Sequence, residues 1–298
     1  MITLPSSQTH SALTDWLETS LIWKGRGTRI TDTTILDIFA EADMDDPEAA
    51  LASITQTVRS RSKIIGRSYP VARQGLGFVM TGDWRDHLPY SFMLLASLNQ
   101  FYVELTYGRG AGNQPAELFE WIAAVAVQRY LGCSVIRIGA PRRRPVPASF
   151  PMALDHVAEQ LNEALGQRDL EDQRSGDDGA DLIAWVSFGD RRESQLILFI
   201  QCTIGTDWER KRDELNLDVW RRHIDWHSYP LKGFAVPFQH EGGGSWRETA
   251  TRGGIVFDRP RIARLVGQTL ADAKLSATIE GWCRRRMRAV SRLAIETR

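Results

Sequence analysis

Two apolar runs in the second half of the chain flank a short polar turn. Residues 181–188 (DLIAWVSF) and 195–202 (QLILFIQC) are separated by GDRRES. The second run is almost entirely apolar, which is typical of a strand buried on both faces. Residues 232–238 and 253–258 have the same strand character. This half of the chain therefore predicts a sheet.

Amphipathic segments alternate with these runs. Residues 150–167 carry apolar side chains at helical spacing, and residues 206–227 predict a charged helix with an apolar stripe. Residues 259–294 are expected to be mostly helical, and the polar residues 168–179 to hold a weak first strand. The order helix, weak strand, strand, strand, helix, strand, helix predicts an α/β domain, a mixed sheet with helices on its faces.

The first half of the chain is expected to be mainly helical. Residues 32–65 show helical periods with the capping residues Asp32 and Asp46, and residues 67–80 predict a short β-ribbon. Apolar helices are expected at 90–105 and 115–132, followed by a buried strand at 133–139.

Helices followed by a ribbon are compatible with a winged-helix arrangement. A basic cluster would then contact a phosphate backbone; its members are Arg59, Arg61, Lys63 and Arg67. A small helical domain with a solvated basic face is the alternative.

A proline-rich segment, residues 139–151, separates the two halves. Four prolines within GAPRRRPVPASFP resist both helix and sheet pairing. We therefore expect an accessory domain over 1–145 and an α/β domain over 146–298.

The charge balance limits what the whole surface can bind. Lys and Arg number 37, as do Asp and Glu, so the net charge is zero and any affinity for nucleic acid must come from local patches. The densest patches are the sequences PRRRP and WCRRRMRAVSR. Within them we single out as candidate phosphate contacts Arg142, Arg143, Arg144, Arg285 and Arg288. A solvated helix end explains the second patch nearly as well.

Cysteine usage and hydropathy exclude several classes of protein. The three cysteines are widely spaced and form no CxxC pair, which argues against a disulfide scaffold or a zinc ribbon. No run approaches the roughly 18 apolar residues that span a membrane. The N-terminus lacks a charged segment followed by an apolar stretch. We therefore expect a cytoplasmic protein without a membrane partner.

An acid and an amide lie where the two apolar runs would meet. Asp181 opens the first run after the glycine-containing turn GDDGA, and Gln201 lies at the end of the second. Paired strands would bring both side chains to one rim of the sheet, beside the backbone carbonyl of Cys202. Such oxygen ligands suit Mg²⁺ (or Mn²⁺), which keeps several waters for itself and for a phosphate. Asp181 as a simple turn residue is the alternative.

This arrangement resembles the PD-(D/E)XK nuclease superfamily, particularly its Mrr-like members, over about residues 150–240. The resemblance maps the acid of the second core strand to Asp181 and the Glu/Gln of the third to Gln201. The acid common on the first core helix would be Glu163 or Glu159. The lysine of the motif falls at Thr203, so the resemblance assigns its role to Lys211 on the following helix.

The resemblance implies a Mg²⁺-dependent endonuclease acting on DNA, as an effector of a bacterial defence system, working as a homodimer or with a protein partner. A nuclease fold that binds or scaffolds without catalysis is a second hypothesis, supported by Thr203. A winged-helix DNA-binding regulator is a third. His223 and His227 have zinc-binding spacing on the predicted helix, but no third ligand is evident, and a packed or solvated pair is favoured.

Overall fold

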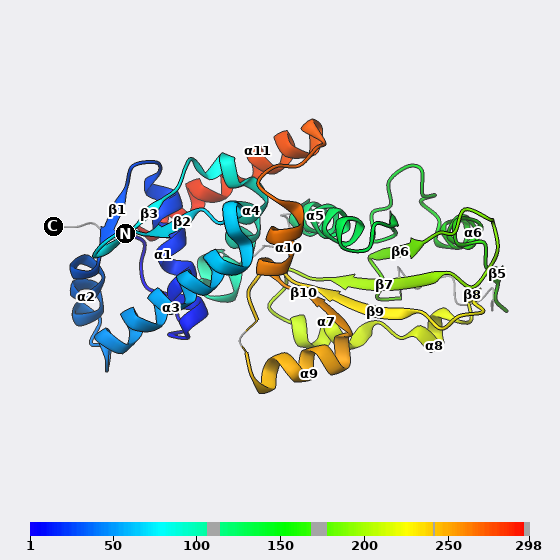
Figure 1. Cartoon of the computed structure of the whole chain (residues 1–298), viewed down its shortest axis with the longest axis horizontal. Helices are drawn as coiled ribbons and strands as arrows, with labels where there is room; N and C mark the ends of the chain where they lie inside the picture. The colour runs from blue at the N-terminus through cyan, green and yellow to red at the C-terminus, as the bar shows by residue number, and fades with distance from the viewer. Residues whose placement is uncertain (106–113, 168–177, 241, 295–298) are drawn as a thin grey trace. The chain divides into compact units, whose positions relative to one another are not determined.

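The larger sheet of the protein contains five strands. The computed structural model describes residues 1–105, 114–167, 178–240 and 242–294. The strand order is β10-β9-β7-β6-β4 (Figure 1). The strands are β4 (Ser134–Arg137), β6 (Leu182–Val186), β7 (Leu196–Cys202), β9 (Leu231–Ala235) and β10 (Ile255–Phe257). Since β4, β6 and β7 pair antiparallel whereas β7, β9 and β10 pair parallel, the predicted mixed sheet is confirmed.

Helices lie on both faces of this sheet. They are α5 (Gln114–Leu131), α6 (Phe150–Leu161), α7 (Trp208–Glu214), α8 (Leu217–Trp220) and α9 (Gly244–Gly253). Helix α5 packs against β4, β6 and β7, whereas α9 packs against β9 and β10. The two helices lie on opposite sides of the five-stranded sheet in Figure 1. A small pair of strands, β5 (Ala164–Leu165) and β8 (Ile224–Asp225), pairs antiparallel.

Helix α6 buries its amphipathic face in the main apolar cluster. Phe150, Leu154 and Leu161 are buried there together with Trp220, which is fully buried. The helix is shorter than the predicted 150–167, because Asn162 takes a left-handed conformation (φ 54°) that ends it. Of the weak strand expected at 168–179, residues 168–177 lie outside the described part of the chain.

The chain divides into two compact units, each made of separate segments. The first unit comprises residues 1–112, 237–239 and 259–298, and the second unit comprises 113–236 and 240–258. The boundary expected after residue 145 therefore falls inside the second unit. The reason is that β4, which precedes the proline-rich segment, pairs with β6, which follows it.

The first unit combines helices with a three-stranded antiparallel sheet. Its helices are α1 (His10–Lys24), α2 (Asp32–Glu41), α3 (Pro47–Ile65), α4 (Leu88–Ser97), α10 (Arg259–Val266) and α11 (Ala273–Val290). Its strands are β1 (Arg29–Thr31), β2 (Val71–Arg73) and β3 (Gly77–Met80), with β3 in the middle. Strands β2 and β3 confirm the predicted ribbon at 67–80, and the predicted helix 90–105 ends at Ser97, where 3₁₀ turns follow.

Two predicted helices are interrupted. Residues 206–227 form α7, α8 and β8 because the chain is extended at Leu215 (ψ 111°) and Asn216 caps a new helix, accepting from the Asp218 N–H at 2.9 Å. Residues 259–294 split into α10 and α11, since Gly267 has φ 78° and Asp272 caps α11. The sequence EGGGSW, expected as a loop, includes the start of α9.

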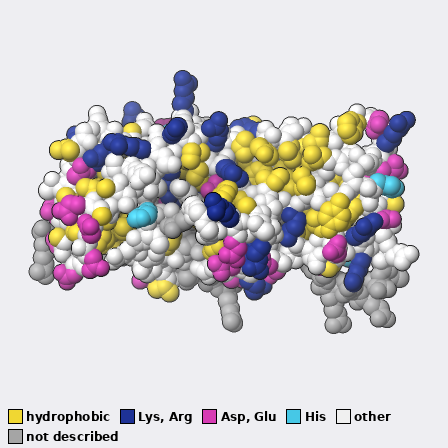
Figure 2. Space-filling model, turned by 60° about the horizontal axis from the view of Figure 1, so that its bottom comes forward, with side chains coloured by type: hydrophobic (Ala, Val, Ile, Leu, Met, Phe, Trp, Pro, Cys, Tyr) yellow, Lys and Arg dark blue, Asp and Glu magenta, His cyan; other side chains and the backbone are white. Residues whose placement is uncertain are grey.

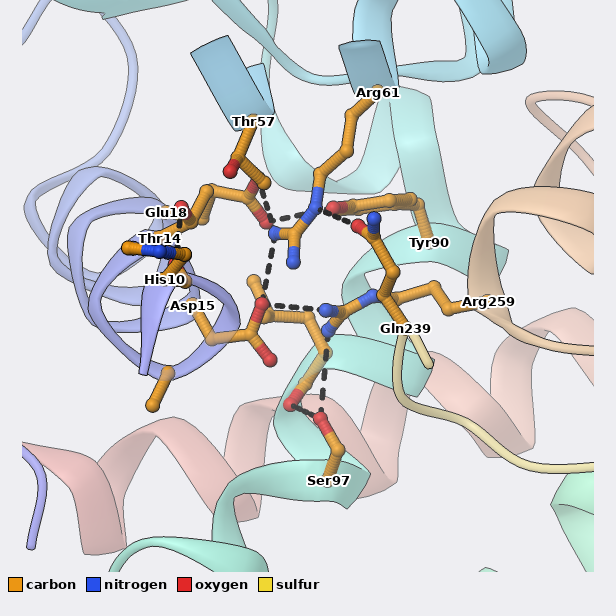
Figure 3. A network of polar contacts seen from close by, with 12 residues as sticks. His10, Thr14, Asp15, Glu18, Thr57, Arg61, Tyr90, Ser97, Gln239 and Arg259 are labelled. Carbon is orange, nitrogen blue, oxygen red and sulfur yellow. Dashed lines mark hydrogen bonds and ion pairs between the residues drawn. The ribbon is translucent and has the colours of Figure 1, made fainter. Parts of the chain in front are cut away.

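Four charged side chains are buried together in the first unit (Figure 3). Asp15 and Glu18 come from α1, Arg61 from α3 and Arg259 from α10, and each side chain is at most 2% exposed. Arg61 Nη1 lies 2.7 Å from Glu18 Oε1 and 2.8 Å from Asp15 Oδ1. Arg259 Nη2 lies 2.5 Å from Asp15 Oδ1. The two guanidinium groups thus neutralise the two carboxylates in the interior of the first unit.

Neutral partners complete this buried charge network. Tyr90 donates to Glu18 Oε2 at 2.6 Å, Tyr69 donates to the other oxygen of Glu18, and Gln239 accepts from Arg61 Nε at 2.6 Å. Burial alone would lower the pKa of Arg61, but the charge of Glu18 raises it well above its ordinary value. Arg61 therefore stays charged and fixes α3, α1 and residue 239 to one another.

The position of Arg61 corrects one expectation. Ile54, Val58, Arg61 and Ile65 recur at helical spacing and form the buried face of α3. Arg61 therefore points into the first unit and cannot contact a phosphate backbone, whereas Arg59, Lys63 and Arg67 are exposed.

We predict that Glu18→Gln strongly destabilises the first unit. The substitution keeps the shape of the side chain but leaves Arg61 and Arg259 facing one carboxylate, and breaking a buried ion pair costs about 3–5 kcal/mol. Urea unfolding followed by circular dichroism measures the loss. The control is Glu248→Gln, which removes an exposed partner of Arg252 and is expected to change stability by less than about 1 kcal/mol. Equal losses in the two variants would contradict a special role for the network.

Candidate functional site

Asp181 is held at the start of β6 by its own backbone and side chain. Its N–H donates to the Ile200 carbonyl at 2.9 Å, and its carbonyl accepts from the N–H groups of Ile138 and Gly139 at 2.8 and 3.1 Å. Its Oδ2 accepts from the Cys202 N–H at 2.7 Å. The side chain of Asp181 is thus fixed at the rim where β4, β6 and β7 meet, and its contact with Cys202 brings two predicted site residues together.

A second carboxylate, Glu120 of α5, reaches the same rim. A Cβ built on Gly139 would lie 2.8 Å from Glu120 Oε2 and 2.9 Å from Asp181 Oδ1. The two oxygens therefore share a small space that only glycine leaves open. Glu120 is buried, with 6% exposure. The sequence does not predict the pairing of Glu120 with Asp181, because the resemblance places the acid at Glu163 or Glu159 and the proline-rich segment predicts a domain boundary between Glu120 and Asp181.

A buried guanidinium neutralises part of this negative charge. Arg137, the last residue of β4, has its Nε 2.5 Å from Glu120 Oε2, and its side chain is 1% exposed. Burial, together with the charges of Asp181 and Glu120, raises the pKa of the Cys202 thiol well above its ordinary value. Cys202 is therefore a neutral thiol.

Gln201 joins the rim to helix α7. Its side chain is buried with the strand end, and its Nε2 lies 3.3 Å from Glu214 Oε2. Glu214 Oε2 also accepts from Lys211 Nζ at 2.8 Å. The buried Oε1 of Gln201 has no hydrogen-bond partner within the described residues. The structure therefore links two further predicted residues, Gln201 and Lys211, through Glu214.

Thr203 directly follows the end of β7 and adds no charge. It is 7% exposed, and its Oγ1 accepts from the Gly205 N–H at 3.1 Å. The cations near the rim include Arg137 from one side and, by way of Glu214, Lys211 and Arg210 from α7.

Glu163 lies away from this rim. Its Oε1 accepts from the Ser194 N–H at 2.9 Å, just before β7 begins, and its Oε2 accepts from the His227 N–H at 3.2 Å. Asp181 contacts the opposite end of β7, so the structure does not bring Glu163 to Asp181. Glu159 is an exposed residue of α6.

His223 and His227 do not share a helix face. The predicted helix is broken, and each imidazole contacts a different carboxylate. His223 Nε2 lies 2.6 Å from Asp178 Oδ2, and His227 Nδ1 lies 3.1 Å from Glu163 Oε2. The two histidines therefore form two separate pairs with acids.

The predicted arginine patches lie in different surroundings. Arg142 stacks on the Phe150 ring with its Cζ 4.9 Å from the centroid, Arg143 pairs with Glu117 at 2.8 Å, and Arg144 is exposed. Arg285 and Arg288 are exposed residues of α11, in the first unit. On the face drawn in Figure 2, basic and acidic side chains are interspersed.

The donors at the rim are hard oxygens. Within residues 1–105, 114–167, 178–240 and 242–294, no group of three or more His, Cys, Asp or Glu is arranged to hold a metal ion. Two carboxylates, Glu120 and Asp181, do converge beside Gly139, and Gln201 has an unused amide oxygen. Mg²⁺ commonly takes one or two protein carboxylates and retains several waters, so these donors fit that ion.

The chain matches no protein-family model, no curated protein and no solved structure. In the part of the chain that the structure describes, no helix is both long and apolar enough to cross a membrane. The arguments for function therefore rest on the geometry of the rim.

We predict that Gly139→Ala disturbs the rim. The new methyl group would lie within 3 Å of both carboxylates, so the Glu120 or Asp181 side chain must move and give up its present contacts, which we expect to destabilise the second unit by about 1–3 kcal/mol. Thermal unfolding measures the effect. Gly242→Ala is the control, because no atom lies within 4 Å of its added Cβ. An unchanged melting temperature for Gly139→Ala would show that the carboxylates move apart freely.

We predict that His227 titrates above its ordinary pKa, because its hydrogen bond to Glu163 favours the protonated ring. The pair of His227 and Glu163 therefore stabilises the folded state fully at pH values below the unfolded-state pKa of about 6.5. This stabilisation is lost as the pH rises through the higher folded-state pKa. An NMR titration of the imidazole protons reports the pKa. In Glu163→Gln the pKa should fall towards its ordinary value, and an unchanged pKa would exclude Glu163 as the cause.

Proposed function

We propose that the second unit is a Mg²⁺-dependent nuclease domain of the PD-(D/E)XK type that hydrolyses phosphodiester bonds, with DNA as its substrate. The observation that carries this proposal is the convergence of Glu120 and Asp181 on the space left by Gly139. The order of elements adds support, since α5, β4, β6, β7, α7 and β9 give helix, three antiparallel strands, helix and a parallel strand, with α6 and β5 inserted after β4 and α8 and β8 after α7. In this arrangement the acid on the first core helix is Glu120 and replaces Glu163.

Each residue of the rim has a definite task in this proposal. Glu120 and Asp181 would hold the metal ion through carboxylate oxygens. The bound ion supplies polarisation of a phosphate oxygen and a lowered pKa for a water molecule. Gln201 Oε1, buried and unpartnered among the described residues, would accept a hydrogen bond from that water and orient it. The Cys202 N–H holds Asp181 in place at 2.7 Å.

Positive charge at the rim would stabilise the phosphorane-like transition state. Because Thr203 is uncharged, this task falls to Lys211, whose ammonium group lies 2.8 Å from Glu214 at the surface end of α7. A cation that faces a phosphate oxygen is most effective where negative charge develops during the reaction. Lys211 would exchange its contact with Glu214 for a contact with the phosphate. A role as an effector of bacterial defence, alone or with a partner protein, would suit such a domain.

A second candidate is a nuclease-like domain that binds nucleic acid without cutting it. The observation that favours it is the ion pair of Arg137 with Glu120, which places a permanent cation beside the carboxylates. A guanidinium in this position competes electrostatically with a divalent ion. In this reading Arg137 stabilises the rim, and the second unit acts as a scaffold.

The first unit carries a third candidate, a winged-helix regulator. Its elements run helix, strand, helix, helix, strand, strand, and β3 lies between β1 and β2, as a winged helix requires. The turn between β2 and β3 carries Leu76, which is 74% exposed. In this third candidate the first unit would bind DNA and the second unit would sense a ligand.

We predict that Asp181→Asn and Glu120→Gln each lower metal-dependent DNA cleavage by at least about a hundredfold, because each removes one carboxylate charge from the metal site. Plasmid and single-stranded DNA are incubated with the protein in Mg²⁺, Mn²⁺ or EDTA and analysed on gels. Asp181→Asn retains an acceptor for the Cys202 N–H, so it should fold.

Glu163→Gln serves as the matched control and should cut like the parent chain, because Glu163 lies at the other end of β7. If the parent chain neither cuts DNA nor binds Mg²⁺ in calorimetry, yet binds DNA, the non-catalytic candidate replaces the nuclease. Cleavage that survives in Asp181→Asn would place the active site elsewhere.

A further inference from the structure

The first unit contains an open cleft, lined by polar and apolar side chains, that the nuclease proposal does not use. Its volume is about 670 Å³. One wall comes from the end of α3 and the turn that follows it, with Ser62, Gly66 and Arg67, and another from the loop after β3, with Thr81 and Gly82. Gln268 and Thr269, just after α10, close a third side. All of these residues belong to the first unit.

The lining of the cleft is built to donate hydrogen bonds. Ser62, Thr81 and Thr269 offer hydroxyl groups, Gln268 an amide and Arg67 a guanidinium. His87 lines it as a buried side chain, 3% exposed, with its Nε2 3.2 Å from Thr81 Oγ1. Tyr69, Val71 and Ala72 add an apolar wall, and the donors of the remaining lining match the oxygens of a phosphate ester.

Positive charge extends from the cleft along α3. Arg59 and Lys63 are exposed one helical turn apart, and Arg67 follows after the end of the helix. None of the three forms an ion pair with an acid among the described residues. Arg264 is exposed nearby, since its Nη1 donates to the Ile64 carbonyl at 3.2 Å. This row of cations exceeds what one phosphate group needs.

One acid, Asp86, also lines the cleft. Its Oδ2 accepts from the Asp83 N–H at 2.8 Å, so the carboxylate is partly engaged in capping the turn that contains Trp84. Its charge opposes an anion in the cleft, which makes it a useful test position. An asparagine there would keep an oxygen to accept from Asp83 and remove the repulsion.

We propose that this cleft binds a phosphate ester, with Arg67 as its charged contact, and that the adjoining row Arg59–Lys63 extends the site along a polyanion. The same chemistry could come from a nucleic acid backbone or from a free nucleotide. The cation row favours the backbone, because a mononucleotide would leave Arg59 unused. This site lies in the first unit and does not depend on hydrolysis by the second.

The test measures binding to the full chain in EDTA, so that cleavage plays no part. Fluorescence anisotropy follows a labelled 20-base-pair DNA duplex, and calorimetry follows AMP and inorganic phosphate. We expect Arg67→Glu to weaken duplex binding about tenfold at about 0.1 M salt and to reduce the salt dependence by about one contact. We expect Asp86→Asn to strengthen binding several-fold.

Arg26→Glu is the matched control. It makes the same charge change at an exposed arginine that also follows a glycine with positive φ, but Arg26 does not line the cleft. Its affinity should equal that of the parent chain. Lys63→Glu provides a second loss variant if Arg67→Glu fails to fold.

Each outcome decides the proposal. The expected pattern with the duplex supports the backbone as the ligand, and the same pattern with AMP alone supports a free nucleotide. If no probe binds, or if Arg67→Glu and Asp86→Asn bind every probe like the parent chain, the cleft is not a phosphate site. Because no metal is present, loss of the nuclease proposal would leave this result unaffected.

Discussion

Two buried arginines and two buried acids determine how the first unit is assembled. Asp15 and Glu18 lie on one helix near the N-terminus, and neither can remain charged in the interior without its partners. One partner, Arg61, comes from α3 and the other, Arg259, from α10, more than two hundred residues after α1. Removing either arginine would leave an uncompensated charge, so the helices must meet in one arrangement. The exposed surface of α3 and the cleft beside it depend on this buried face of the helix.

In the second unit, the arrangement of the rim depends on the close approach of two carboxylates beside Gly139. Gly139 follows β4, where the chain must pass between α5 and the end of β6. The absence of a side chain there allows two carboxylates to approach one another, and Arg137, two residues earlier, offsets part of their repulsion. The same few residues therefore provide the oxygen atoms that could bind a metal ion and the positive charge that offsets those oxygens. In a nuclease, Arg137 would lie beside a bound metal ion. In a non-catalytic scaffold, Arg137 would take the place of that ion.

Periodicity predicted the strands of the sheet well, because β6 and β7 are long apolar runs with a polar turn between them. It failed for residues 206–227, where apolar spacing continues through Leu215 although the backbone is extended there and Asn216 starts a new helix. Residues that meet at the end of β7 were partly predictable: Asp181 and Gln201 follow from strand pairing. Glu120 was not, since its partner lies across a segment of four prolines. The inward direction of the Arg61 side chain was not predictable either, because hydropathy assigns an arginine to the surface.

The interleaving of the two units has a consequence for synthesis on the ribosome. Proteins are made from the N-terminus at about 5–20 residues per second, and domains usually fold as they emerge. The first unit cannot follow that order, because Gln239 and Arg259 are needed to complete its buried charges. Asp15 and Glu18 can meet Arg61 early, but the ion pair of Asp15 with Arg259 must wait until the whole second unit has been translated. The N-terminal unit of this chain is thus the last to be finished.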